Sequence, residues 1–136
     1  MIRSLAAAVS LLTVLAAPAQ ATEWITCGDS ERKVSFDILV GFMEVIAIDT
    51  IRIETGGKIW STKGEAGTIS ITRGQSFETP DQIWIDVMDE NVNAFVARFR
   101  VFKASDDTEG VEERHATGGV LHMPGIGVWT VGCSGP

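Results

Sequence analysis

The stretch 82-QIWIDVMDENVNAFVARFRVFKA-104 alternates apolar and polar side chains in two runs that flank a short polar loop. In an extended chain, successive side chains point to opposite faces, so a period of two places the apolar residues of each run on one side. Two such runs joined by a polar loop predict an antiparallel β-hairpin. Its predicted inner face consists of Ile83, Ile85, Val87, Phe95, Phe99 and Val101.

The rest of the chain after Trp24 has the same character, and helical periodicity is weak. Shorter strand candidates, separated by glycine, proline and acidic turn residues, lie at 23–26, 33–39, 45–54, 58–61, 67–72, 111–115, 119–123 and 127–133. Short strands at this spacing predict an all-β domain, either an antiparallel β-sandwich or a small β-barrel of about eight short strands. The pattern leaves the choice between these two open.

The run 45–54 contains a change of phase. Its isoleucines at positions 46 and 48 point to one face, whereas those at positions 51 and 53 point to the other. One inserted residue produces such a switch, so we predict a β-bulge near Asp49 or Thr50. A turn of helix from Phe42 to Ile46 is the alternative.

The first residues have the layout of a cleavable secretory signal. Arg3 precedes an uncharged apolar run from Leu5 to Ala17, which is followed by Pro18 and the small-residue motif 19-AQA-21. The run is shorter than the roughly 20 apolar residues of a membrane-spanning helix. We therefore expect residues 1–21 to be a signal peptide. Residues 22–136 are then a single all-β domain, periplasmic or secreted, without membrane insertion after cleavage.

Two cysteines lie near the two ends of the expected domain. Cys27 follows the first apolar residues after the leader, and Cys133 ends the last strand candidate. In an oxidising compartment such a pair predicts a disulfide. The bond would close a loop of about 100 residues, for which chain-entropy reasoning gives at most about 4.7 kcal/mol of stabilisation. A reactive or metal-binding pair needs a close second ligand, as in C-x-x-C, which the chain lacks.

The chain is acidic, with 18 acidic and 11 basic residues and a net charge of −7. Loss of Arg3 with the leader makes the exported chain more acidic still. Nucleic acids and anionic lipids are bound through clustered lysine and arginine, so neither is expected as a partner. A cationic partner suits this charge, and so does solubility alone.

The polar loop of the hairpin resembles the start of a calcium-binding loop. Asp89, Asn91 and Asn93 occupy the first three ligand positions of the pattern D-x-[DN]-x-[DN]-G. Ala94 and Arg100 stand where the pattern needs a glycine and a bidentate glutamate. Asp and Asn also suit the local hydrogen bonds of a hairpin loop, so we expect an ordinary loop there.

His115 and His122, with Glu113, are the remaining candidate metal ligands. Two imidazoles are too few for zinc, which takes three or four well-placed ligands, so we expect no metal and no cofactor. The motifs of serine hydrolases, zinc proteases and nucleotide-binding loops are missing from the sequence, and we expect no enzymatic activity. The sequence leaves open one enzymatic alternative, hydrolysis of a glycan by a pair of carboxylates, because any two of the 18 acidic residues could meet in space.

The outer face of the predicted hairpin is the candidate interaction surface. One register places Trp84 opposite Arg100 and Asp86 opposite Arg98, which sets an ion pair beside a cation–π pair. A register shifted by two would pair Trp84 with Arg98 instead. If both faces of this hairpin were covered, as in a sandwich, Trp84 would belong to the core.

The other tryptophans are expected to pack. Trp24 and Trp129 lie near the two cysteines in sequence, which predicts a shared cluster against the disulfide. Trp60 is favoured as a core residue, with an exposed sugar-stacking ring as the alternative.

A short exported β-domain bracketed by two cysteines is similar in outline to the periplasmic lysozyme inhibitors of bacteria. Those inhibitors carry a Ser-Gly loop followed by tyrosine, whereas this chain has no tyrosine and its Ser134-Gly135 lies in the tail. The resemblance implies inhibition of a cationic hydrolase and carries over no residues. The leading expectation is a non-enzymatic binding or accessory protein of the cell envelope, whose partner is a protein or a glycan. A glycan-acting hydrolase is the other alternative.

Overall fold

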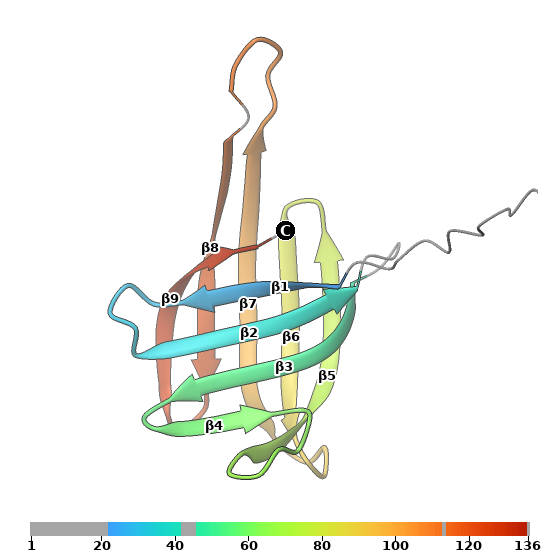
Figure 1. Cartoon of the computed structure of the whole chain (residues 1–136), viewed down its shortest axis with the longest axis vertical. Coiled ribbons are helices and arrows are strands. Elements are labelled where there is room, and N and C mark those ends of the chain that lie inside the picture. Colours follow the sequence, from blue (N-terminus) through green and yellow to red (C-terminus); the bar gives the residue numbers. More distant parts are fainter. Residues whose placement is uncertain (1–21, 42–45, 113, 136) are drawn as a thin grey trace, which may run out of the picture.

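A computed structural model describes residues 22–41, 46–112 and 114–135 of the chain. Within these residues the fold is all-β, as predicted, with nine strands and no helix (Figure 1). The predicted signal peptide, residues 1–21, lies outside the described residues. The strands are β1 (Thr22–Gly28), β2 (Val34–Gly41), β3 (Ala47–Thr55), β4 (Lys58–Ser61), β5 (Ile69–Thr79), β6 (Gln82–Asp89), β7 (Phe95–Asp106), β8 (Arg114–Met123) and β9 (Gly127–Ser134).

The strands form a closed barrel in which each strand pairs with its neighbours in sequence and β9 returns to β1. Of the two architectures that the sequence left open, the barrel is therefore the observed one. All pairings are antiparallel except β4–β5, which is parallel and covers two residue pairs. In Figure 1, β1 to β4 run across the view, whereas β5 to β8 run along its vertical axis behind them.

The β6–β7 hairpin adopts the first of the two predicted registers. Trp84 lies opposite Arg100, and Asp86 lies opposite Arg98. The predicted inner face is buried except at Phe95, where the prediction is wrong. The register shifts after Val87 so that Met88 faces Phe95, and this irregularity turns the Phe95 ring outward.

The inner faces of all nine strands meet in one apolar core. At its centre the rings of Phe36 and Phe99 stack with their centroids 4.2 Å apart. Trp60 is buried, as predicted, and Trp129 packs partly buried against the core. The largest fully buried side chains are those of Phe36, Phe99, Ile38, Ile51, Ile53, Ile85, Leu121 and Met123.

The predicted bulge in the third strand is confirmed. Leu39 pairs with Thr50 and the next residue, Val40, pairs with Ile48, so Asp49 is the inserted residue. The alternative turn of helix from Phe42 to Ile46 lies almost entirely outside the described residues.

Two strand predictions need correction. Residues 111–112 lie in a turn region and β8 begins at Arg114, so the strand expected at 111–115 and that expected at 119–123 are replaced by one continuous strand.

β5 runs on to Thr79, well past the predicted end, because β6 supports it across a polar stretch. This stretch contains a register irregularity at Gly74, where an added Cβ would lie 2.7 Å from the carbonyl oxygen of Asp86.

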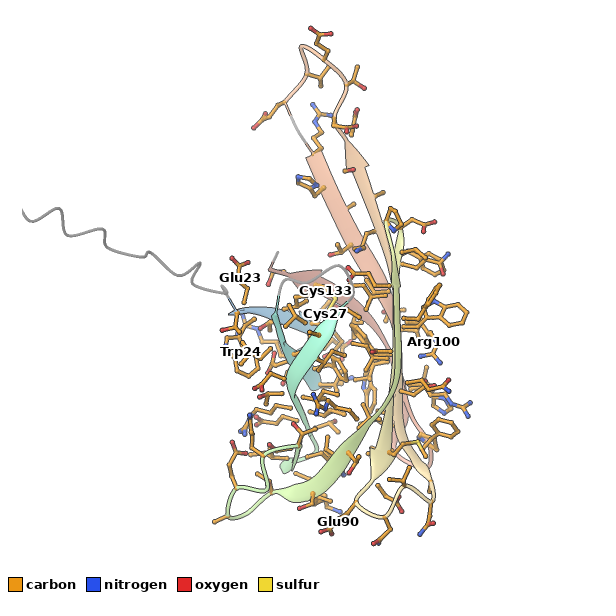
Figure 2. All side chains as sticks on the ribbon, turned by 90° about the vertical axis from the view of Figure 1, so that its right-hand side faces the viewer. Glu23, Trp24, Cys27, Glu90, Arg100 and Cys133 are labelled. Atoms are coloured by element: carbon orange, nitrogen blue, oxygen red, sulfur yellow. A yellow bond between two sulfur atoms is a disulfide. The ribbon has the colours of Figure 1, made fainter. Side chains whose placement is uncertain are left out.

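The disulfide joins the first strand to the last. Cys27 of β1 lies directly opposite Cys133 of β9, and their sulfur atoms are bonded, which confirms the predicted pair. Trp24 does not share a cluster with Trp129 against this bond. It lies an odd number of residues from Cys27 on the same strand, so its ring projects from the outer face and is 48% exposed (Figure 2).

Replacing Cys27 and Cys133 together by serine should lower the free energy of unfolding by up to about 4.7 kcal/mol while the far-UV circular dichroism spectrum keeps its β character. The bond restrains the unfolded chain over a separation of 106 residues, whereas the core does not depend on it. Urea unfolding measures the change, and chemically reduced wild-type protein is the control. Equal stability of the oxidised and serine forms would contradict this account.

Candidate functional site

Apolar side chains line the outer face of the sheet formed by β5 to β8. Phe77, Trp84, Arg100 and Val120 lie directly opposite one another on four successive strands, and Phe102 follows two residues after Arg100 on the same face. The exposed fractions are 54% for Phe77, 44% for Trp84, 58% for Phe102 and 41% for Val120. We call these five residues the outer strip. Contiguous exposed apolar residues of this kind mark interaction sites more often than scattered ones do.

Arg100 holds the centre of the outer strip in place. Its guanidinium donates hydrogen bonds to the backbone oxygens of Ile85 and Phe99 at 3.2 and 2.8 Å and to Asp86 Oδ1 at 2.6 Å. Its Cζ lies 5.0 Å from the ring centroid of Trp84, so the predicted cation–π pair is present. Figure 2 shows Arg100 on the side of the sheet away from the disulfide. Four contacts fix this side chain before any partner arrives.

The ion pair of this face differs from the predicted one. Asp86 lies opposite Arg98 in the ladder, but its carboxylate binds the diagonal neighbour Arg100. The Arg98 guanidinium lies instead over the ring of Phe95, 4.1 Å from the ring centroid. Phe95 was predicted to lie in the core, but the register shift turns its ring outward, where it contacts Arg98.

Phe77 extends the outer strip to the edge of the sheet. Its ring meets that of Trp84 edge to face, with centroids 6.1 Å apart and an interplanar angle of 65°. Phe77 lies beyond Thr72, the predicted end of the fifth strand, so the sequence pattern does not identify it. The turn signal Pro80, directly after Thr79, could have located it, because a two-residue turn there sets Phe77 opposite Trp84.

The β7–β8 hairpin projects beyond the barrel (Figure 1). Its stem continues past the last β6 pairing at Phe102 as far as the pair of Asp106 and Arg114. The tip carries the exposed acids Asp106, Asp107, Glu109 and Glu112. Hydrogen bonds from the Thr108 hydroxyl and then from its backbone N–H lower the pKa of Asp106, which keeps this carboxylate charged.

In the loop that resembles a calcium site, the first predicted ligand, Asp89, binds backbone N–H groups of the same loop. The Asp89 carboxylate accepts hydrogen bonds from the backbone N–H groups of Asn93, at 2.6 Å, and Ala94, at 3.3 Å. Val92 in this loop adopts a left-handed φ of 59°. Among the residues that the structure describes, no group of three histidine, cysteine or acidic side chains could hold a metal ion. His115 and His122 lie seven positions apart on β8 and therefore face opposite ways.

Two carboxylates away from the outer strip, Asp29 and Asp37, have shifted pKa values. Asp29 and Glu54 line a common hollow beside the β1–β2 and β3–β4 turns. Asp29 accepts hydrogen bonds from the backbone N–H groups of Lys33 and Val34, and the bond from Val34 is the main reason that the pKa of Asp29 is lowered. On the outer face of β2, burial raises the pKa of Asp37, whose Oδ1 has no hydrogen-bond partner in the described part of the chain.

No family model, curated protein or solved structure matches the chain. Over residues 22–41, 46–112 and 114–135, no helix has the length and apolar character needed to span a membrane.

Arg98→Ala and Arg100→Ala should differ in their effect on stability. Arg98 is exposed, so its loss should change the free energy of unfolding by less than about 1 kcal/mol. Arg100→Ala should cost about 2 kcal/mol, because it leaves the partly buried Asp86 carboxylate without its charged donor. Urea unfolding of both variants measures the difference. A loss for Arg98→Ala as large as that for Phe99→Ala would mean that the outer face is covered in the native protein.

Proposed function

We propose that this chain is an exported, non-enzymatic binding domain, an accessory protein of the cell envelope that docks another protein on the outer strip. The observation that carries the proposal is the row of exposed aromatic side chains around the immobilised Arg100. Aromatic residues and arginine are enriched at the centres of protein interfaces and supply most of their hot spots.

The proposed location rests on the disulfide and on the predicted leader. Structural disulfides persist in the periplasm and outside the cell and are rare in the reducing cytosol. A periplasmic or secreted position is therefore the one that suits this chain.

A protein partner fits the outer strip better than a glycan does. Sugar rings stack on open, flat aromatic faces. Here the Trp84 ring already contacts the Arg100 guanidinium and the Phe77 ring, which stands at 65° to it. The aliphatic Val120 extends the same surface. A mixed aromatic and aliphatic surface suits an apolar protein partner.

The non-enzymatic part of the proposal rests on how the described carboxylates are used. Asp86 is paired with Arg100, and Asp29 is held by backbone N–H groups of its own turn. A hydrolase of glycans needs two carboxylates facing a common substrate cleft. Asp29 and Glu54 line one hollow, but the Asp29 carboxylate is already held by the backbone N–H groups of its turn, so the two do not form such a pair.

Trp84→Ala should abolish or strongly reduce capture of the partner by the immobilised protein from an envelope extract. Trp24→Ala is the matched control, because it removes a tryptophan of similar exposure, 48% against 44%, from β1, outside the outer strip. Truncation of a central interface tryptophan typically costs at least about 2 kcal/mol of binding, which corresponds to a loss of roughly 30-fold. Comparison of the captured bands by quantitative mass spectrometry measures the effect. Equal losses for the two variants, or none for Trp84→Ala, would contradict the proposed site.

A second candidate function is inhibition of a cationic hydrolase, and the projecting β7–β8 hairpin is the observation that favours it. Its stem carries small residues, with Ala104 opposite Ala116, and its tip carries four acids with no lysine or arginine from residue 104 to residue 112. A slender acidic arm suits insertion into a positively charged active-site cleft.

Shortening this hairpin should separate the two candidate functions. In the variant, residues 105–115 are replaced by Asn-Gly, which closes the hairpin directly after the Ala104–Ala116 pair. If the chain is an inhibitor, the wild-type protein slows peptidoglycan hydrolysis by a cationic lysozyme, and the shortened variant does not. Trp84→Ala is the control and should still inhibit. Undiminished hydrolysis in the presence of the wild-type protein would refute inhibition of this enzyme class.

A further inference from the structure

The outer face of β6 to β8 carries positive charge on a chain whose net charge is −7. Arg98 lies directly opposite Asp86 on one side and opposite His122 on the other, and Arg100 lies in the adjacent row. The Asp86 carboxylate binds Arg100 at 2.6 Å, and this pair neutralises itself. Arg98 has no ion pair with any carboxylate of the described residues, so its charge stays uncompensated.

Exposed apolar side chains surround Arg98. Phe95 lies beneath its guanidinium, and Trp84 and Val120 occupy the next row. Val128, which is 65% exposed, ends the row of Arg98 and His122. A partner that covers the outer strip and extends over this neighbouring row also covers Arg98.

Covering Arg98 removes water from its guanidinium. Dehydration of an unpaired charge is costly, and a carboxylate with matching hydrogen-bond geometry offsets the cost. The planar guanidinium on the Phe95 ring presents its N–H groups in a fixed plane, which suits such a carboxylate.

We propose that the outer strip recognises an apolar protein segment that carries a carboxylate, and that Arg98 receives this carboxylate. This inference rests on the proposed function, because it names the chemistry of the partner that the outer strip docks. The positive charge of Arg98, which complements the partner's carboxylate, is opposite in sign to the net charge of the chain. A basic partner segment would meet repulsion from Arg98 beside the outer strip.

The experiment is a titration of the ¹⁵N-labelled, disulfide-bonded protein with two tripeptides, acetyl-Phe-Glu-Leu-amide and acetyl-Phe-Gln-Leu-amide. These probes have the same shape and differ in one charge. The expected result is a shift of the Trp84 indole and β6–β8 backbone signals, with the Glu peptide binding about two- to five-fold more tightly than the Gln peptide. The preference should shrink at high salt, because exposed ion pairs are screened.

Arg98→Gln should abolish the preference for the Glu peptide, so that the two peptides bind the variant with equal affinity. Arg32→Gln is the matched control, because it removes one positive charge from the exposed β1–β2 turn and should keep the preference. The spectrum of each free variant reports whether it is folded.

The outcomes separate this inference from the proposed function. If both peptides bind the outer strip equally, the carboxylate is not recognised and the inference fails, whereas the outer strip stands as an apolar docking site. If neither peptide shifts these signals, both proposals fail. N-acetylmuramic acid serves as a third probe. If it binds at Arg98 more tightly than the Glu peptide does, the partner is an anionic sugar and the proposal of a protein segment is wrong.

Discussion

The register of the β6–β7 hairpin is the constraint on which the core and the outer strip both depend. With Trp84 opposite Arg100, the alternate residues Ile85 and Phe99 point into the barrel. A slip of one residue would exchange the two faces of a strand, and on β7 it would bury Arg100 and expose Phe99. The burial of Ile85 and Phe99 therefore fixes the position of Arg100 beside Trp84 and Asp86. The same pairing that stabilises the fold builds the candidate site.

Closure of the barrel is strong at one seam and weak at the other. β1 and β9 are joined by antiparallel pairing and by the Cys27–Cys133 bond. At the opposite seam, β4 and β5 share two parallel residue pairs, and Arg73 reaches across to donate a hydrogen bond to the backbone oxygen of Ile48. The disulfide thus secures the two strands that lie at the chain ends, where fraying begins. The outer strip lies on β5 to β8, which pair with one another in antiparallel ladders, and its β5 strand also forms the weak seam with β4.

Local sequence pattern was sufficient for some parts of the fold and not for others. Alternation predicted the β6–β7 pairing and the bulge at Asp49, because both depend on neighbouring residues. It failed at Phe95, where an irregularity in the ladder reverses the phase without a local signal such as glycine. The prediction for Trp24 failed for another reason: it rested on nearness to Cys27 in sequence, whereas alternation directs Trp24 outward once Cys27 is inside.

The candidate site was predictable to a similar degree. Trp84, Asp86, Arg98 and Arg100 all lie on the outer face as predicted from their phase. The choice of ion-pair partner was not predictable, because Asp86 can reach both arginines and the preference for Arg100 depends on two further backbone acceptors, the oxygens of Ile85 and Phe99. Phe77 and Val120 join the strip through pairings with strands whose bounds the pattern misjudged.

An exposed aromatic row is also a hazard, because the same surface that docks a partner can pair with a second copy of the chain. Two features of this molecule oppose self-association. The net charge of −7 makes copies repel one another at long range. At short range, two outer faces brought together would set one Arg98 near the other, and Asp86 is already bound to Arg100 and cannot compensate both. A carboxylate-bearing partner does not meet the second obstacle, because its negative charge pairs with Arg98, so the charge at this face that opposes a second copy of the chain favours a different surface.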